Sequence, residues 1–399
     1  MNIRSSFLML LSTVSFLGIT SVYGQDLTER EKEMLGLIER LEKRVEQLER
    51  SIQRTQPPAE LDRRVQELEE KIESIEPAQD KDFRVYWKEG MRFDSQDGSV
   101  KLKFGGRIMN DRAFFSVDDD LTSEYGDFEN GTEFRRARLY ISGDIYEHFM
   151  FKAQYDFAGG DADFKDMYIG LKDIPYIGHL KVGHFKEPFG LEEMNSSKYI
   201  IFMERALTSP FTPVRNTGFM IYDDALDERL TWAAGVFRDT DDFGDGVEDG
   251  NFNITGRVTG LPWYRENGRK LLHLGLAYSF RSPDETRFRD RPEAHLSPVR
   301  LVDTGSFPVD NERRIGTELA LVYGPFSFQS EYMRSDVDTD LVGNRDFDAF
   351  YAMASYFITG ENRAYKRSAG AFDRVKPKRN FSLNGEDRGP GAWEVALRD

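Results

Sequence analysis

Cysteine is absent from the 399 residues of the sequence. Its absence excludes structural disulfides, thiolate zinc sites, iron–sulfur clusters and thiol catalysis. Positive charge is also scarce, because 54 Lys and Arg stand against 70 Asp and Glu, which gives a formal net charge of −16. A protein that coats nucleic acid needs a basic surface, so we expect no nucleic-acid partner.

Long hydrophobic runs are missing beyond the N-terminal segment. Hydrophobic residues make up 39% of the chain, and no later apolar run reaches the ~18 residues that a transmembrane helix needs. Aromatic residues make up 13%, and there are 34 Gly. This composition favours an alternating β protein over a helical one.

Residues 1–24 have the pattern of a secretory signal peptide. Arg4 provides the positive start, and an apolar stretch follows from Phe7 to Val22. Small residues precede Gln25, where we expect the mature chain to begin. An uncleaved anchor helix is the alternative. With either interpretation the protein is exported.

Residues 25–80 carry a second pattern, an apolar repeat with spacings of 4 and 3 that Pro57-Pro58 interrupts. The repeat predicts a coiled coil that holds copies of the chain together, since one narrow seam is apolar and its flanks are charged. An amphipathic helix lying on its own domain is the alternative. Its mixed Leu and β-branched positions do not distinguish a dimer from a trimer. The seam residues are Met34, Ile38, Leu41, Val45, Leu48, Ile52, Leu61, Val65, Leu68, Ile72 and Ile75.

From about residue 83 the apolar period changes to 2. Val100, Leu102 and Phe104 alternate with Lys101 and Lys103, and we count about 13 such strand-like runs up to the last residues. Aromatic residues bracket many runs, and short turns alternate with long polar connections. Both features are typical of an antiparallel transmembrane β-barrel. A secreted soluble β-sandwich is the alternative.

Several short motifs resemble the phosphate-selective porin O and P family, over roughly residues 83–398. They are Phe104-Gly105-Gly106-Arg107, Phe134-Arg135-Arg136-Ala137, Val182-Gly183-His184-Phe185-Lys186-Glu187-Pro188-Phe189-Gly190-Leu191-Glu192 with Ser196-Ser197-Lys198 and Met203-Glu204-Arg205, Leu272-His273-Leu274-Gly275-Leu276-Ala277-Tyr278, Thr359-Gly360-Glu361 with Tyr365-Lys366, and Gly391-Ala392-Trp393-Glu394.

The resemblance implies a 16-stranded barrel over residues 81–399, assembled as a homotrimer, with its lumen narrowed by an infolded loop. It places the protein in the outer membrane of a Gram-negative-type bacterium, among outer-membrane lipid. The odd number of runs and the end of the chain within the last one predict a barrel that lacks its final strands, so the chain should not close a barrel by itself.

A pore needs no catalytic residue, and we expect no enzyme activity and no cofactor. An anion pathway needs Arg and Lys on lumen-facing positions, because guanidinium groups match phosphate oxygens. The resemblance implies such a role for Arg107, Arg135, Arg136, Lys198 and Arg205. Arg138 has the same parity as Arg136 and should also face inward. Weaker candidates are Lys152, Lys186 and Arg215.

Two considerations oppose a simple phosphate pore. Lumen arginines often pair with carboxylates, and Glu133, Asp144 and Asp156 are such candidates. Glu193 stands where phosphate-selective members carry a loop Lys, and a carboxylate there would repel an anion. We therefore predict passive diffusion of small anions, with phosphate-type solutes favoured. The alternative function is a structural tether whose coiled coil contacts the periplasmic cell wall.

An acidic loop contains Asp239, Asp241 and Asp245 and forms a weak candidate calcium site. Its spacing fails the EF-hand pattern, because Phe243 stands where an oxygen ligand is needed. A solvated loop is the alternative. The five His residues show no paired-ligand spacing, so we predict no other metal site.

Overall fold

The computed structural model describes residues 83–246, 251–340, 343–383 and 389–399, together with a few helical positions between residues 36 and 66. The chain separates into two compact units, Met1–Asp80 and Lys81–Asp399. The predicted signal peptide and every residue of the predicted coiled-coil seam lie outside the described residues. None of the helices that the structure describes is long and apolar enough to cross a membrane.

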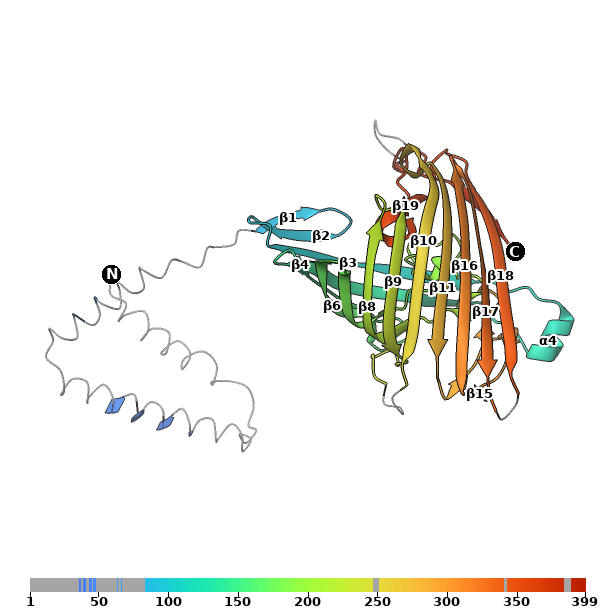
Figure 1. Cartoon of the computed structure of the whole chain (residues 1–399), viewed down its shortest axis with the longest axis horizontal. Helices are drawn as coiled ribbons and strands as arrows, with labels where there is room; N and C mark the ends of the chain where they lie inside the picture. Colours follow the sequence, from blue (N-terminus) through green and yellow to red (C-terminus); the bar gives the residue numbers. More distant parts are fainter. Residues whose placement is uncertain are drawn as a thin grey trace, which may run out of the picture. The chain divides into compact units, whose positions relative to one another are not determined.

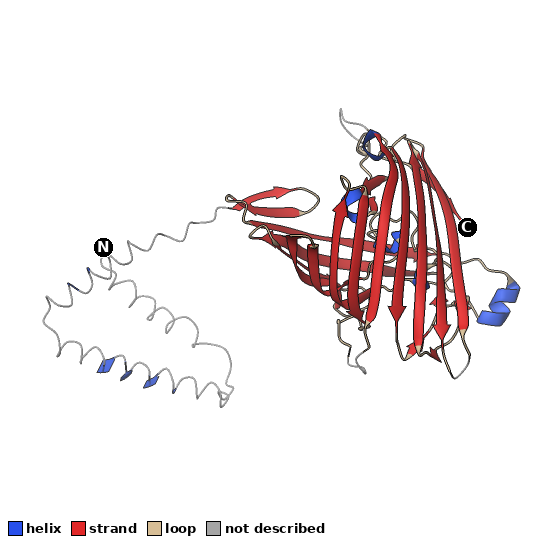
Figure 2. Cartoon of the chain, in the orientation of Figure 1, coloured by secondary structure: helices blue, strands red, loops and turns tan. Residues whose placement is uncertain are grey.

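The second unit is built on one large antiparallel sheet, in which neighbours in sequence are neighbours in space (Figures 1 and 2). Within the described ranges it has 15 strands, from β1 to β21, and neither end of the order pairs with a further strand, so the sheet is open as predicted. The strands are β1 (Phe83–Trp87), β2 (Met91–Ser95), β3 (Val100–Ala113), β4 (Gly131–Ile145), β5 (Phe149–Asp156), β6 (Asp163–Ile174), β7 (Gly178–Lys186), β8 (Arg215–Ala225), β9 (Leu230–Arg238), β10 (Asn253–Arg265), β11 (Lys270–Arg281), β16 (Asn311–Tyr323), β17 (Phe326–Asp338), β18 (Arg345–Phe357) and β21 (Glu394–Arg398).

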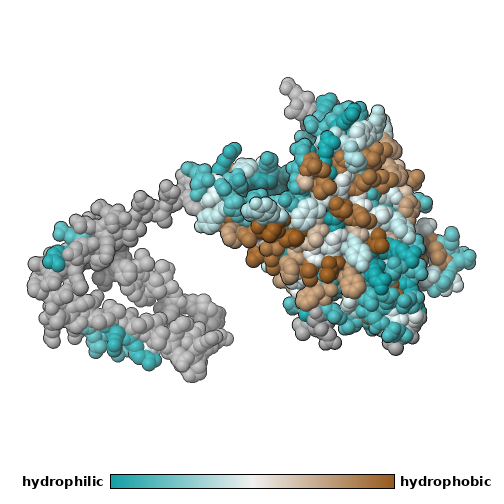
Figure 3. Space-filling view, in the orientation of Figure 1, coloured by the Kyte–Doolittle hydropathy of each residue, from teal (hydrophilic) through white to brown (hydrophobic). Residues whose placement is uncertain are grey.

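The predicted runs correspond to the strands from β3 onward, whereas β1 and β2 were not anticipated. The period-2 pattern explains the two faces of the sheet. On β3, Ile108 is 76% exposed on the outward face, whereas Arg107 and Met109 are partly buried. Hydrophobic side chains gather in this way over the outer surface of the strands (Figure 3).

The connections at the two ends of the sheet differ in length. Tight turns join β4 to β5, β6 to β7 and β16 to β17, whereas long segments such as residues 187–214 and 282–310 join strands at the other end. We call these the short-turn end and the long-loop end. A further long segment, residues 358–393, begins at the short-turn end. The Phe357 N–H at the end of β18 donates to the carbonyl of Pro325 (3.0 Å), and Pro325 lies in the tight turn between β16 and β17.

These long segments contain the short elements of the unit. They are α4 (Asp119–Tyr125), α5 (Leu191–Met194), η1 (Ser209–Phe211), η2 (Glu266–Gly268), β12 (Glu285–Thr286), β13 (Arg289–Asp290), β14 (Val302–Asp303), β15 (Phe307–Pro308), β19 (Ala364–Lys366), η3 (Arg367–Ala369) and β20 (Ala371–Asp373).

Two buried apolar clusters join the long segments to the concave face of the sheet. In one, Phe189 and Phe288 from the long-loop end pack with Ala277 of β11 and Met333 of β17. In the other, Leu191 and Phe372 pack with residues of β10, β11 and β16. Residues 187–214 and 358–393 therefore fold inward from opposite ends of the sheet.

Candidate functional site

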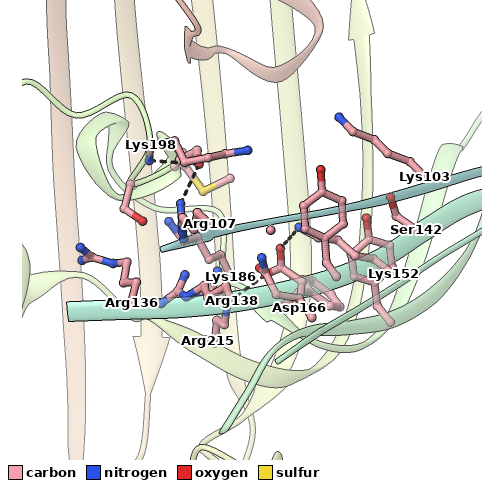
Figure 4. A pocket seen from close by; sticks show the side chains of 18 of the residues that line it. Lys103, Arg107, Arg136, Arg138, Ser142, Lys152, Asp166, Lys186, Lys198 and Arg215 are labelled. Atoms are coloured by element: carbon pink, nitrogen blue, oxygen red, sulfur yellow. Dashed lines mark hydrogen bonds and ion pairs between the residues drawn. The ribbon is translucent and has the colours of Figure 1, made fainter. Parts of the chain in front are cut away.

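The inward face of β3 to β8 borders a cavity of about 540 Å³ that is lined mainly by cations. Among the described residues that line this cavity, Asp166 is the only one with a carboxylate. Figure 4 shows arginine side chains gathered at one end of the view and Lys103, Ser142 and Lys152 at the other. The cationic lining residues are Lys103, Arg107, Arg136, Arg138, Lys152, Lys181, Lys186, Lys198, Arg205, Arg215 and Lys366.

The strand register brings most of the predicted arginines together. Arg107 of β3 lies directly opposite Arg138 of β4, and Met109 lies opposite Arg136. The register then shifts, so Asn110 pairs with Phe134 and Arg135 is left without a partner in the ladder. Such a bulge places an extra residue on one strand and changes the direction of its side chain. Arg135 can thus reach an inward partner although its parity differs from that of Arg136.

Arg107 and Arg136 have no carboxylate partner among the described residues. Arg107 makes one long contact, from Nη1 to the Ser196 hydroxyl oxygen (3.5 Å), and its Nε is buried without a hydrogen bond. Arg136 is 3% exposed, and its Nη1 contacts the Met109 sulfur at 3.8 Å. A buried guanidinium without a counter-ion is costly unless an anion or water satisfies it. These two side chains are therefore suited to receive a mobile anion.

Other predicted residues are already neutralised. Arg138 pairs with Asp156 at 2.5 Å, and Arg135 pairs with Glu204 at 2.5 Å. Asp166 binds Arg215 at 2.8 Å and also binds Lys152. For these side chains the interpretation as ordinary lumen ion pairs holds, and of the three carboxylates suggested as partners Asp156 is the one that pairs with a candidate arginine.

Two other carboxylates suggested as partners pair elsewhere. Glu133 contacts the His295 ring nitrogen Nδ1 at 2.7 Å, and Asp144 binds Lys172 at 2.9 Å. Neither therefore neutralises a predicted pathway arginine.

The infolded segment, residues 187–214, carries Lys198 and Arg205 into the cavity lining. Glu193, expected to repel anions, is 4% exposed and bonds Lys186 at 2.8 Å and Arg205 at 2.9 Å. Burial alone would raise the pKa of the Glu193 carboxyl, but Arg205 and Lys186 outweigh it and hold that pKa below its ordinary value. Glu193 is therefore not the unpaired carboxylate that would repel an anion, because its charge is paired with two cations.

Buried carboxyl groups attach residues 187–214 to β11 and β17, on the side of the sheet away from the basic cavity. Glu331 of β17 accepts the backbone N–H groups of Leu191 (2.6 Å) and Glu192 (2.9 Å). Glu187 pairs with Arg281 of β11 at 3.0 Å. Because breaking a buried pair leaves an uncompensated charge, these contacts hold the loop at a fixed place beside the cavity.

Two further chambers adjoin the basic cavity. An outer chamber of about 270 Å³ shares Arg136, Arg138, Arg205 and Arg215 with it. An inner chamber of about 570 Å³ shares Lys103, Gly106, Tyr140 and Lys198 with it. Of the nine predicted pathway residues, Arg135 lines only the outer chamber, and the other eight line the central cavity. The shared lining residues place the three chambers next to one another on the inward side of the sheet.

Among the lining residues that sequence reasoning missed are three cations, Lys103, Lys181 and Lys366, and the aromatic Tyr140. Lys103 has the same parity as Arg107 on β3, so the pattern could have identified it. Lys181 also lies on an alternating strand. Lys366 belongs to β19 within the inward-folded residues 358–393, and no local pattern shows that this segment enters the lumen.

The acidic loop does not gather its carboxylates. Asp239 binds Arg281, whereas the Asp241 carboxylate accepts the backbone N–H groups of Phe243 and Asp245 at 2.9 Å each. Within the described ranges, no three His, Asp or Glu side chains come together as a metal site.

Comparisons with known proteins agree with this geometry. The family model described as phosphate-selective porin O and P matches residues 102–399. Porin O of Pseudomonas aeruginosa is 28% identical over 343 residues, which cover 78% of this chain and 74% of that protein. An uncharacterized protein of Caulobacter vibrioides is 28% identical over 327 residues, which cover 79% of this chain and 63% of that protein.

Two solved structures complete the comparison. The outer membrane channel DcaP of Acinetobacter baumannii is 12% identical with a TM-score of 0.40, covering 67% of this chain and 76% of that one. The trimer form of OmpT from Vibrio cholerae is 10% identical with a TM-score of 0.34, covering 75% and 98%. On the family match and the similarity to Porin O, the chain belongs to the phosphate-selective porin O and P family and is an outer-membrane porin channel.

Proposed function

We propose that the channel passes small anions by passive diffusion and favours phosphate-type solutes. The observation that carries this proposal is the pair Arg107 and Arg136, two guanidinium groups beside the basic cavity with no carboxylate partner in the described residues. Guanidinium groups donate paired N–H bonds that match phosphate oxygens. The family description, phosphate-selective porin O and P, supports this choice of solute.

The paired cations have a supporting role. Arg138, Arg205, Arg215 and Lys186 keep the lining basic while their carboxylates hold the wall and the infolded segment in place. The net charge of −16 does not contradict this arrangement. Charges separated by more than a Debye length of ~8–10 Å are largely screened at physiological salt, so distant acidic residues have little effect on the cavity.

The test is electrophysiology of the complete gene product, with its barrel closed, in planar bilayers. A salt gradient should give a reversal potential of the sign expected for anion flow, and added phosphate should reduce chloride conductance by occupying the arginine pair. A cation-preferring reversal potential would contradict the proposal.

We further infer the domain arrangement predicted from the sequence. Residues 1–24 act as the export signal, residues 25–80 form the periplasmic coiled coil, and residues 81–399 form a sheet of the 16-stranded barrel type that works as a homotrimer. The 3.5-residue repeat and the family membership support this arrangement.

Deletion of residues 25–80 tests this inference together with the tether alternative. Conductance should survive if transport is primary, whereas attachment to the cell envelope should fail if tethering matters. Chemical cross-linking of the two forms would show whether the coiled coil stabilises the trimer.

A further inference from the structure

Tyr140 lies where the central cavity and the inner chamber meet, because both are lined by Tyr140 together with Lys103, Gly106 and Lys198. A solute that moves between the two chambers therefore passes its ring. Neither Arg107 nor Arg136 is among the described residues that line the inner chamber, so the arginine pair and Tyr140 occupy different positions along the path.

The ring of Tyr140 rests against a glycine on the neighbouring strand. Gly105 of β3 is the cross-strand partner of Tyr140, and a Cβ built on Gly105 would lie 2.5 Å from the Tyr140 hydroxyl oxygen and 2.6 Å from Cζ. Only glycine leaves this space free. The ring therefore lies along the wall and does not project across the lumen.

Three ammonium groups surround this ring. The Nζ atoms of Lys152, Lys103 and Lys198 lie 5.6 Å, 5.9 Å and 6.0 Å from the ring centroid of Tyr140. Within the described part of the chain, the Tyr140 hydroxyl makes no hydrogen bond to another group. The position thus combines a flat apolar surface, a free hydroxyl and several cations.

The inner chamber next to this ring has a partly apolar wall. Trp87, Tyr199, Ile200, Ile201 and Val375 form the apolar part of its lining, and its volume is about 570 Å³. The charged residues Glu89, Arg363, Asp373, Arg374 and Glu394 line the rest. The Tyr199 ring also lies near Lys198, with 5.5 Å between Nζ and the ring centroid. There is room here for the apolar body of a solute whose anionic head remains among the lysines.

We propose that Tyr140 forms, with Lys103 and Lys198, a second anion subsite that favours anions carrying a planar apolar group, such as aryl phosphates. The lysines hold the anionic head, and the planar group stacks on the tyrosine ring. The inference rests on the proposed anion channel and adds a solute class to it. The arginine pair recognises the charged head alone, whereas this subsite also contacts the rest of the solute.

The test compares two solutes with the same charge, phenyl phosphate and methyl phosphate, as blockers of chloride conductance through the complete gene product. Phenyl phosphate should reach half-block at the lower concentration. Tyr140→Leu, which keeps an apolar side chain without a ring, should raise that concentration about tenfold, in line with the loss of one aromatic stacking contact. Block by methyl phosphate should change less than about twofold, because its head group keeps the same lysines.

Two matched variants complete the test. Tyr140→Phe should retain the preference for phenyl phosphate, since it keeps the ring. Gly105→Ala should weaken the preference, because the new Cβ displaces the ring. Equal block of the wild type by both esters, or an equal change for both in Tyr140→Leu, would overturn the subsite while leaving anion selectivity intact. A cation-selective wild type would instead overturn the proposed function.

Discussion

The two halves of the sheet use their inward-facing charges in opposite ways. On β3 to β8 the cations face open space, and Arg107 and Arg136 have no carboxylate partner among the described residues. On β10 to β18 the charged groups are buried in closed networks. Arg257, for example, forms two 2.8 Å bonds to Glu318, which also contacts His273 at 2.9 Å.

The infolded segments explain this difference. Tyr365 contacts the ring of His273 at 2.6 Å, and the carbonyl of Gly370 accepts a 2.8 Å bond from Arg257, so residues 358–393 are attached to the β10 to β18 half. Glu331 attaches residues 187–214 to the same half. One half therefore supports the packing, and the path for solutes remains along the other.

Removing both unpaired arginines should cause the largest loss of phosphate binding in the channel. In Arg107→Ala with Arg136→Ala, the phosphate concentration that halves chloride conductance should rise about 100-fold or more, since each charge-assisted hydrogen bond contributes about 1.5–3 kcal/mol. Titration of single-channel currents with phosphate measures the change. An unchanged titration would show that anion recognition lies elsewhere in the lumen.

Removing a loop attachment on the other half should affect the channel indirectly. Glu331→Ala leaves the backbone N–H groups of Leu191 and Glu192 without their acceptor, at a cost of about 1–3 kcal/mol for each buried group. The infolded segment should then move, with a larger, noisier conductance and faster proteolysis within residues 187–214. Glu331→Gln keeps one acceptor oxygen and serves as the control, with a smaller effect. Identical traces for wild type and Glu331→Ala would contradict the anchoring role.

These two contrasts also show how much could be predicted from the sequence. The family resemblance indicated Arg107 and Arg136 as pathway residues, and parity with Arg136 added Arg138; all three line the basic cavity. Ion pairing could not be predicted, because it depends on partners from distant segments, as for Arg135 with Glu204 in the infolded loop. The bulge at Arg135 and the burial of Glu193 arise from tertiary packing, which no local pattern records.

The charge of Lys198 should make anion selectivity depend on pH. Burial lowers its pKa, and the nearby positive charges of Arg107, Lys103 and Lys152 lower it further. A lysine with a lowered pKa loses its charge at a lower pH than an ordinary lysine, so anion selectivity should fall as the pH rises from neutral through the alkaline range. Reversal potentials measured between pH 7 and pH 10 would record this fall.

Lys198→Arg provides the matched control, because a guanidinium remains charged throughout that range. The variant should flatten the alkaline fall in selectivity. The same pH profile in both proteins would assign the titration to another group.

The smallest effect on anion selectivity is expected for an arginine of β3 to β8 that is already paired with a carboxylate. Arg138 and Asp156 pair at 2.5 Å, so removing both in Arg138→Ala with Asp156→Ala takes equal and opposite charges from the cavity. The reversal potential and the phosphate titration should then stay within about twofold of wild type, whereas Arg138→Ala alone leaves an uncompensated carboxylate that repels anions. This double variant also removes a guanidinium from the wall that carries Arg107 and Arg136. We expect it to keep the selectivity that is lost in Arg107→Ala with Arg136→Ala. If it matched the loss in that pair, total cation number would control selectivity, and the distinction between paired and unpaired arginines would have no functional meaning.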